Sequence, residues 1–214
     1  EEWNAARHLT HQLTDEFRRA RSIDEILRTH ARFTTALNDI HNATCWYRLG
    51  VLASRDRRQR QWLWRSERAL SPLRDHTLAM LPLCNEQGLS NTAYGLALAG
   101  MRSRPPWKEL YNALEQHAVR KIGEFTDQGL SNTAWAFATA GHAAPALFDA
   151  IAEHAVPRLG KFTDQGLSNT AWAFATAGHA APTLFDAIAE EARKRVGAGQ
   201  KLRDPRLFEA LKSM

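Results

Sequence analysis

The sequence predicts an all-α protein, an α-solenoid of stacked helix pairs with a period of about 37 residues. Three observations predict this fold. The stretch GLSNTAWAFATAGHAAP begins at Gly129 and recurs letter for letter from Gly166, and a diverged copy, GLSNTAYGLALAG, begins at Gly88. Apolar residues recur at helical spacing in both halves of the repeated unit, and glycine or proline separates the halves. Because one pair of helices cannot bury both of its apolar faces, we expect the copies to stack.

The first helix of the unit is represented by PALFDAIAEHAVPRLG. Pro145 suits the first helical position, and Leu147, Phe148 and Ile151 follow at helical spacing. We expect Gly160 to close this helix in the left-handed conformation.

The second helix of the unit begins after a small polar residue that caps its free N–H groups and ends at a glycine. Leu130, Ala134 and Phe137 share one face of this helix and are candidate core residues. The expected caps are Asn85, Thr126 and Thr163, and the expected closing glycines are Gly100, Gly141 and Gly178.

The repeats divide the chain into four parts. Residues 125–153 match residues 162–190 at every position except Ala146, which is Thr183 in the later copy. Upstream, DIHNATCWYRLG is a weaker match that aligns Asn42 with Asn132. The expected parts are N-terminal helices with a degenerate repeat at 1–53, a basic insert at 54–68, three helical pairs plus a first helix at 69–196, and a capping or truncated helix at 197–214.

Composition favours a globular chain with a polyanionic partner. Of the 214 residues, 44% are apolar and 24% are charged, which is enough apolar material for a core. The net charge of +5 and the pI of about 9.6 suit nucleic acid. Cys45 and Cys84 lack metal-binding spacing and are expected to be buried free thiols. No apolar run approaches the ~18 residues of a membrane span, and a chain that begins with Glu1 is expected to be a fragment or a processed form.

The basic insert, SRDRRQRQWLWRSER, carries six arginines and two tryptophans. Its arginines are candidates for phosphate contacts, with Trp62 and Trp64 available for stacking on bases. The alternative is a solvated helix whose tryptophans dock on the repeats. The candidate phosphate-binding residues here are Arg57, Arg58 and Arg60.

Three motifs together, FTDQGLSNTAWAFATAG, PPW before a helix and RSIDEILRTHARFTTALNDIHN, give the chain a resemblance to a known family. Over about residues 20–196 it resembles the octotricopeptide and heptatricopeptide repeat proteins, which are related to FAST-kinase-like and RAP-domain proteins. The resemblance implies RNA binding in a mitochondrion or chloroplast, for transcript maturation, stability or translation, or for anchoring ribosomal RNA. The RAP domain that often ends such proteins is not visible in the sequence.

Two rows on the first helices are candidate RNA contacts. The cations Lys121, Arg158 and Arg195 occupy equivalent positions and are expected to contact phosphates on one open face shared with the arginines of the insert. Their alternative role is that of exposed cations favoured at a helix C-terminus. The candidate base-contacting residues are His117, His154, Gln116, Glu153 and Glu190, for which the alternative is a helix-surface or inter-repeat hydrogen bond.

Asparagines occupy one equivalent position in the second helices, where asparagine lowers helix propensity. Either the asparagine amides form hydrogen bonds to one another between adjacent second helices, or the amides face a ligand. Because a row that distinguishes bases should vary between units and this row does not, we expect a structural ladder. Trp135 and Trp172, which follow one turn later, are expected in the core. The ladder residues are Asn91, Asn132 and Asn169.

No nucleophile–base set, paired carboxylates at a glycine-rich turn, or metal-ligand spacing is visible in the sequence. We therefore expect a non-catalytic chain without cofactor, metal or small-molecule substrate. The expected function is binding of organellar RNA along one face of the repeats. The alternative is a structural or assembly subunit that binds protein within a large organellar complex such as a ribosome.

Overall fold

The computed structural model describes residues 2–199, with side chains from Leu9 onward. The described chain is helical and contains no strand, which confirms the predicted all-α class. The expected capping segment at 197–214 lies outside the described residues except for its first three positions.

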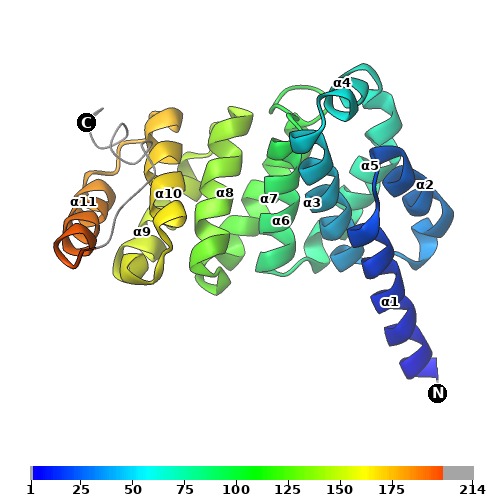
Figure 1. Ribbon diagram of the computed structural model, residues 1–214, viewed down its shortest axis with the longest axis horizontal. Helices are drawn as coiled ribbons and strands as arrows, with labels where there is room; N and C mark the ends of the chain where they lie inside the picture. Colours follow the sequence, from blue (N-terminus) through cyan, green and yellow to red (C-terminus); the bar gives the residue numbers. More distant parts are fainter. Residues whose placement is uncertain (1, 200–214) are drawn as a thin grey trace.

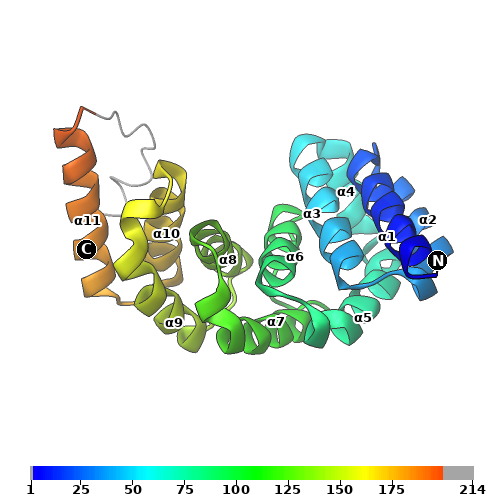
Figure 2. The same ribbon diagram turned by 90° about the horizontal axis from the view of Figure 1, so that it is seen from below.

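The helices form two rows that follow the chain in order (Figure 1). Figure 2 shows that the rows curve, with one row on the concave side and the other on the convex side. The inner, concave row consists of α3 (Asp39–Arg55), α6 (Glu86–Leu98), α8 (Asp127–Ala140) and α10 (Asp164–Ala177), and α1 (Glu2–Arg19) packs against α3. The outer row consists of α2 (Ile23–Phe33), α5 (Ser71–Met80), α7 (Lys108–Lys121), α9 (Pro145–Ala155) and α11 (Pro182–Gly197). One further helix, α4 (Arg57–Arg65), lies within the predicted basic insert.

Each inner helix begins at a side-chain cap. Thr126 accepts a hydrogen bond from the N–H of Gly129 at 3.0 Å, and Thr163 does the same for the N–H of Gly166. Both helices end at a glycine in the left-handed region, Gly141 with φ 69° and Gly178 with φ 63°. The predicted ends of these helices are therefore confirmed. The other inner caps are Asn38 and Asn85.

The outer helices end differently from the prediction. In place of a left-handed glycine, short 3-10 helices join outer to inner helices, and Gly160 lies inside one of them. In that segment Pro157 has no N–H to donate and cannot continue the α-helical ladder, so α9 ends at Ala155. The joining 3-10 helices are η1 (Thr34–Ala36), η3 (Leu81–Leu83), η4 (Ile122–Glu124) and η5 (Val156–Lys161), whereas η2 (Glu67–Leu70) lies between α4 and α5.

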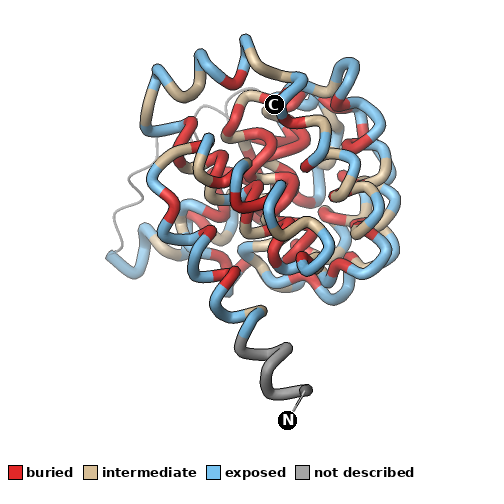
Figure 3. The backbone as a smooth tube through the Cα atoms, turned by 90° about the vertical axis from the view of Figure 1, so that its right-hand side faces the viewer, coloured by how far each residue is buried: buried red, intermediate tan, exposed pale blue. Residues whose placement is uncertain are grey.

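The core lies between the two rows, where Figure 3 shows the buried residues gathered. Leu130 and Phe137 of α8 are fully buried and meet buried Leu147, Phe148 and Ile151 of α9 in one continuous cluster. Burial of each such side chain stabilises the fold by about 1.5–3 kcal/mol. Cys45 and Cys84 are free and buried as expected, and burial raises the pKa of the Cys84 thiol to about 12.

The inner helices run parallel and in register. A Cβ added to Gly95 of α6 would lie 2.2 Å from the carbonyl oxygen of Trp46 in α3. Only glycine therefore allows the backbones of these two helices to approach so closely. Counting from the caps, Asn42 falls at the position of the core residue Leu130, and Thr44 at the position of Asn132. The predicted alignment of Asn42 with Asn132 is therefore wrong by two residues.

Candidate functional site

A groove of about 950 Å³ crosses the concave side of the molecule, over α3, α6, α8 and α10. The N-terminal halves of α6, α8 and α10 present two rows of amide side chains to the groove, each in one equivalent position per helix. The Gln row is Gln87, Gln128 and Gln165, and the Asn row is Asn91, Asn132 and Asn169. The inner helices, which we did not expect to carry the site, thus line the concave face.

The Asn row does not form the predicted ladder. Among the described residues, no side-chain amide of the Asn row or the Gln row takes part in a hydrogen bond. Asn169 is only 5% exposed, and Asn91 and Asn132 are half-buried. The prediction of amides bonded to one another is therefore wrong, and the alternative, amides that face a ligand, agrees with the geometry.

Aromatic rings follow the Asn row by one helical turn and form an aromatic row: Tyr47, Tyr94, Trp135 and Trp172. The centroids of successive rings are 6.3, 5.1 and 6.4 Å apart. Tyr47 and Tyr94 line the groove. Trp135 and Trp172, expected in the core, pack against it but are half-buried rather than enclosed.

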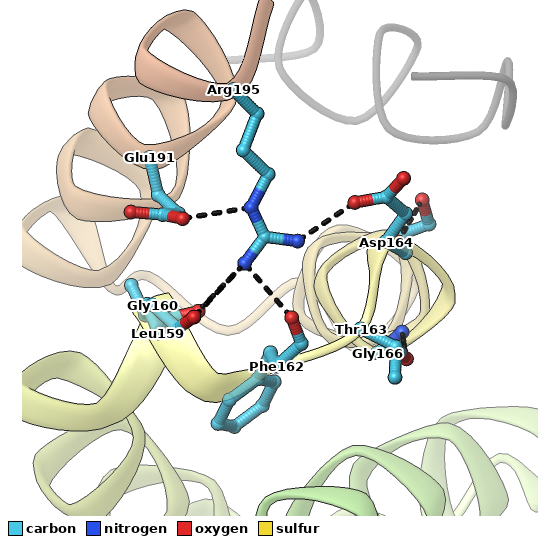
Figure 4. A network of polar contacts seen from close by, with 9 residues as sticks. Leu159, Gly160, Phe162, Thr163, Asp164, Gly166, Glu191 and Arg195 are labelled. Atoms are coloured by element: carbon cyan, nitrogen blue, oxygen red, sulfur yellow. Dashed lines mark hydrogen bonds and ion pairs between the residues drawn. The ribbon is translucent and has the colours of Figure 1, made fainter. Parts of the chain in front are cut away.

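The cations predicted to contact phosphates bond instead to the chain itself. Arg195 is 10% exposed and donates to the carbonyl of Phe162 at 2.8 Å, to Asp164 at 2.7 Å and to Glu191 at 2.7 Å (Figure 4). Arg158 donates to the carbonyl of Phe125 at 3.0 Å, and Lys121 to that of Cys84 at 2.6 Å. Each acceptor is the residue before an inner-helix cap, so the basic row joins each outer helix to the preceding inner helix.

The basic row and the arginines of the insert lie at opposite ends of the inner helices. The basic row bonds where α6, α8 and α10 begin, whereas α4 follows the last residue of α3, and these helices run parallel. The expected shared open face is therefore wrong. Arg57 and Arg58 are exposed, while Arg60 donates to the carbonyls of Ala53 and Ser54.

The α4 surface consists of five arginines and two tryptophans. The tryptophans Trp62 and Trp64 are 40% and 58% exposed, and Trp64 approaches the loop at Gly100. The guanidinium groups of these arginines form no hydrogen bond or ion pair within the described residues. They are Arg55, Arg57, Arg58, Arg65 and Arg68.

The predicted base-contacting residues lie on the outer row, outside the lining of the groove. His154 donates from Nδ1 to the carbonyl of Ala150 at 2.9 Å and faces Gly123 of the preceding unit. Glu190 pairs with Arg193 on the surface of α11. The remaining three are exposed or half-buried on α7 and α9: Gln116, His117 and Glu153.

The fold brings together two histidine clusters that the sequence did not indicate. Ser103 Oγ lies 2.6 Å from Nδ1 of His142, whose Nε2 lies 3.1 Å from Glu115. This hydroxyl–imidazole–carboxylate chain resembles the order of groups in a hydrolase. The imidazole is only 7% exposed and stacks on Tyr111, so the chain of contacts fastens the loop after α6 to the loop after α8.

In the second cluster, Nε2 of His30 lies 3.1 Å from Nδ1 of His76. Burial, and secondarily the neighbouring His76, lower the pKa of His30 to about 4. Over the described residues, no group of three or more histidine, cysteine or acidic side chains is placed to hold a metal ion. Nor does any described helix combine the length and apolar character needed to cross a membrane.

No known protein-family profile matches the sequence, and no curated protein sequence matches it either.

Proposed function

We propose that the chain is a non-catalytic α-solenoid that binds single-stranded RNA along its concave groove, in a mitochondrion or chloroplast. The observation that carries the proposal is the groove itself, where two rows of amides that have no partner among the described residues lie beside a continuous row of aromatic rings. Bases that stack on aromatic side chains gain about 1–3 kcal/mol each, and amides pair with base edges. The resemblance to organellar repeat proteins supports the same assignment.

The positive charge around the groove suits a phosphate backbone. Lys161 and Arg18 are exposed and line the groove. Arg48 also lines it, but its guanidinium donates twice to the carbonyl of Ala20. The α4 surface adds five arginines, at the other end of α3, whose guanidinium groups have no partner among the described residues. Phosphate contacts are therefore assigned to Lys161, Arg18 and the arginines of the α4 surface, in preference to Arg48 and the basic row, whose charged groups donate to backbone carbonyls.

A protein partner is the alternative, and the sameness of the Gln and Asn rows favours it. An extended polypeptide offers N–H and C=O groups that do not depend on its sequence, so identical amides suit its backbone. A scaffold subunit of this kind would need neither the exposed tryptophans of α4 nor its arginines. For that reason RNA is the preferred ligand.

The test is binding of a fluorescently labelled single-stranded RNA, followed by anisotropy across a salt series. We expect the logarithm of the affinity to fall linearly with the logarithm of salt, with a slope of about 0.7 per phosphate neutralised. The double variant Trp135→Ala/Tyr94→Ala should lose about tenfold or more in affinity. A matched control on the outer row, Gln116→Ala/Glu153→Ala, should bind as the parent does. Failure to bind at low salt would overturn the proposal and favour a protein partner.

A further inference from the structure

Three inner helices carry the same trio of side chains on one helix face. The glutamine and the asparagine of each trio line the groove, and the aromatic ring follows one turn after the asparagine, with Tyr94 the ring that lines the groove. In α8 the trio is Gln128, Asn132 and Trp135, spaced by four and three residues, which places all three on one helix face. The trio in α10 is identical in residue type, and the trio in α6 differs only by tyrosine in place of tryptophan. The equivalent members are Gln165, Asn169 and Trp172 in α10, and Gln87, Asn91 and Tyr94 in α6.

The fourth inner helix does not carry this trio. At the positions set by its cap, Asn38, α3 has Ile40, Thr44 and Tyr47. It keeps the aromatic ring but has no amide. The groove therefore contains three equivalent amide sites in a row, with a ring alone at the end formed by α3.

Resting on the proposed function, we propose that the groove binds a run of three consecutive adenines, one on each of α6, α8 and α10. Helical-repeat proteins that bind single-stranded RNA use one repeat per base, read by two or three side chains. Asparagine and glutamine pair bidentately with the N6 and N7 atoms of adenine, and the ring provides a stacking surface. Because the three trios carry the same groups, each selects the same base.

The asparagines, which are half-buried or buried, make the selection strict, whereas Gln87, Gln128 and Gln165 are exposed. Asn169 is 5% exposed, and none of the six amides has a partner among the described residues. A base with the wrong edge would cover an amide and leave it unpaired, which costs more than leaving the amide in water. Each mismatch should therefore lower the affinity by about tenfold.

The experiment compares labelled RNAs of about twelve nucleotides at one salt concentration: an oligoadenylate, an oligouridylate, and a mixed sequence without adjacent adenines. We expect the oligoadenylate to bind at least tenfold more tightly than the other two. The variant Asn132→Thr, which gives α8 the residue found at the same position in α3, should lose about tenfold for the oligoadenylate and nothing for the mixed sequence. Thr44→Ala, at the matched position in α3, should change neither affinity, and circular dichroism checks that each variant is folded.

The two proposals fail in different ways. Equal affinity for the oligoadenylate and the mixed sequence, or a preference for oligouridylate, would overturn the adenine assignment while leaving RNA binding in place. Equal loss by Asn132→Thr on every RNA would also overturn it, because the amide would then contribute without selecting a base. Absence of binding to all three RNAs at low salt would overturn the proposed function itself.

Discussion

The guanidinium of Arg195 shows why residue type and spacing do not predict a phosphate contact. An arginine near the end of a helix is compatible with solvent, a phosphate or a backbone carbonyl. Its acceptor, the carbonyl of Phe162, is 33 positions earlier in the chain and becomes a neighbour only when outer and inner helices pack. Cations at equal spacing are therefore predicted to have the same kind of partner in each unit. The spacing does not indicate whether that partner is solvent, a phosphate or a backbone carbonyl.

Removing this cation should lower the stability of the fold. In Arg195→Met the carbonyl of Phe162 and the carboxylates of Asp164 and Glu191 lose a charged donor in a mostly buried site, so we expect a loss of about 2–3 kcal/mol in the free energy of unfolding. Urea denaturation measures this loss. Arg193→Met, whose partner Glu190 is exposed, serves as the control and should change stability by less than about 0.5 kcal/mol. Equal stability of both variants would contradict the role assigned to Arg195.

The Asn row was misassigned for a different physical reason. Constancy between units favours a structural role, but constancy is equally required when each unit binds the same group. The sequence contains the spacing that puts Asn132 and Trp135 on one face. It does not contain the curvature that makes this face concave, because curvature arises from small rotations accumulated between packed helices.

At the scale of single helices, the sequence was most informative where local chemistry sets the structure. The caps Thr126 and Thr163 and the closing glycines Gly141 and Gly178 act within a few residues, and all were predicted correctly. The 3-10 helices after the outer helices were missed, since a glycine such as Gly160 is compatible with both left-handed and right-handed backbone. The register of α3 was missed because few residues of its repeat remain.

The packing of α2 against α5 should make stability depend on pH. His30, which is 1% exposed, meets His76 across this contact, and the pKa of His30 is lowered to about 4. In the unfolded chain the pKa is about 6.5, so the unfolded state binds the proton first as pH falls. The stability that comes from burying neutral His30 is therefore fully present above pH ~6.5. It is lost as the pH falls towards ~4, by up to 1.4 kcal/mol of unfolding free energy per pH unit.

Thermal unfolding at pH values from 7 to 4 tests this dependence. His30→Gln cannot take up the proton and should reduce the decline in melting temperature over the range. His11→Gln, an exposed histidine in α1, is the matched control and should retain the decline of the parent. A decline that is unchanged in His30→Gln would contradict the assignment.

At the scale of the whole molecule, the two identical copies of the repeated sequence are buried to different extents. Ala138 and Ala140 of α8 are 7% and 4% exposed, whereas their counterparts in α10, Ala175 and Ala177, are exposed. The reason is position, since α8 has an inner helix on both sides and α10 has a described inner helix on one side only. Sequence identity therefore fixes the helix and its caps, while the number of packed neighbours sets how much of its surface is buried.

This difference should appear as a gradient of local stability along the chain. The sequences of α8 and α10 are identical, so their amides have the same intrinsic exchange rates, and any difference in hydrogen exchange reports packing alone. We expect amides of α10 to exchange about tenfold or more faster than the matching amides of α8. Mass spectrometry distinguishes the two helices if the peptides extend to Ala146 or to Thr183, the one position at which the copies differ. Equal protection in the two helices would mean that the exposed flank of α10 is covered in solution, and would contradict the gradient.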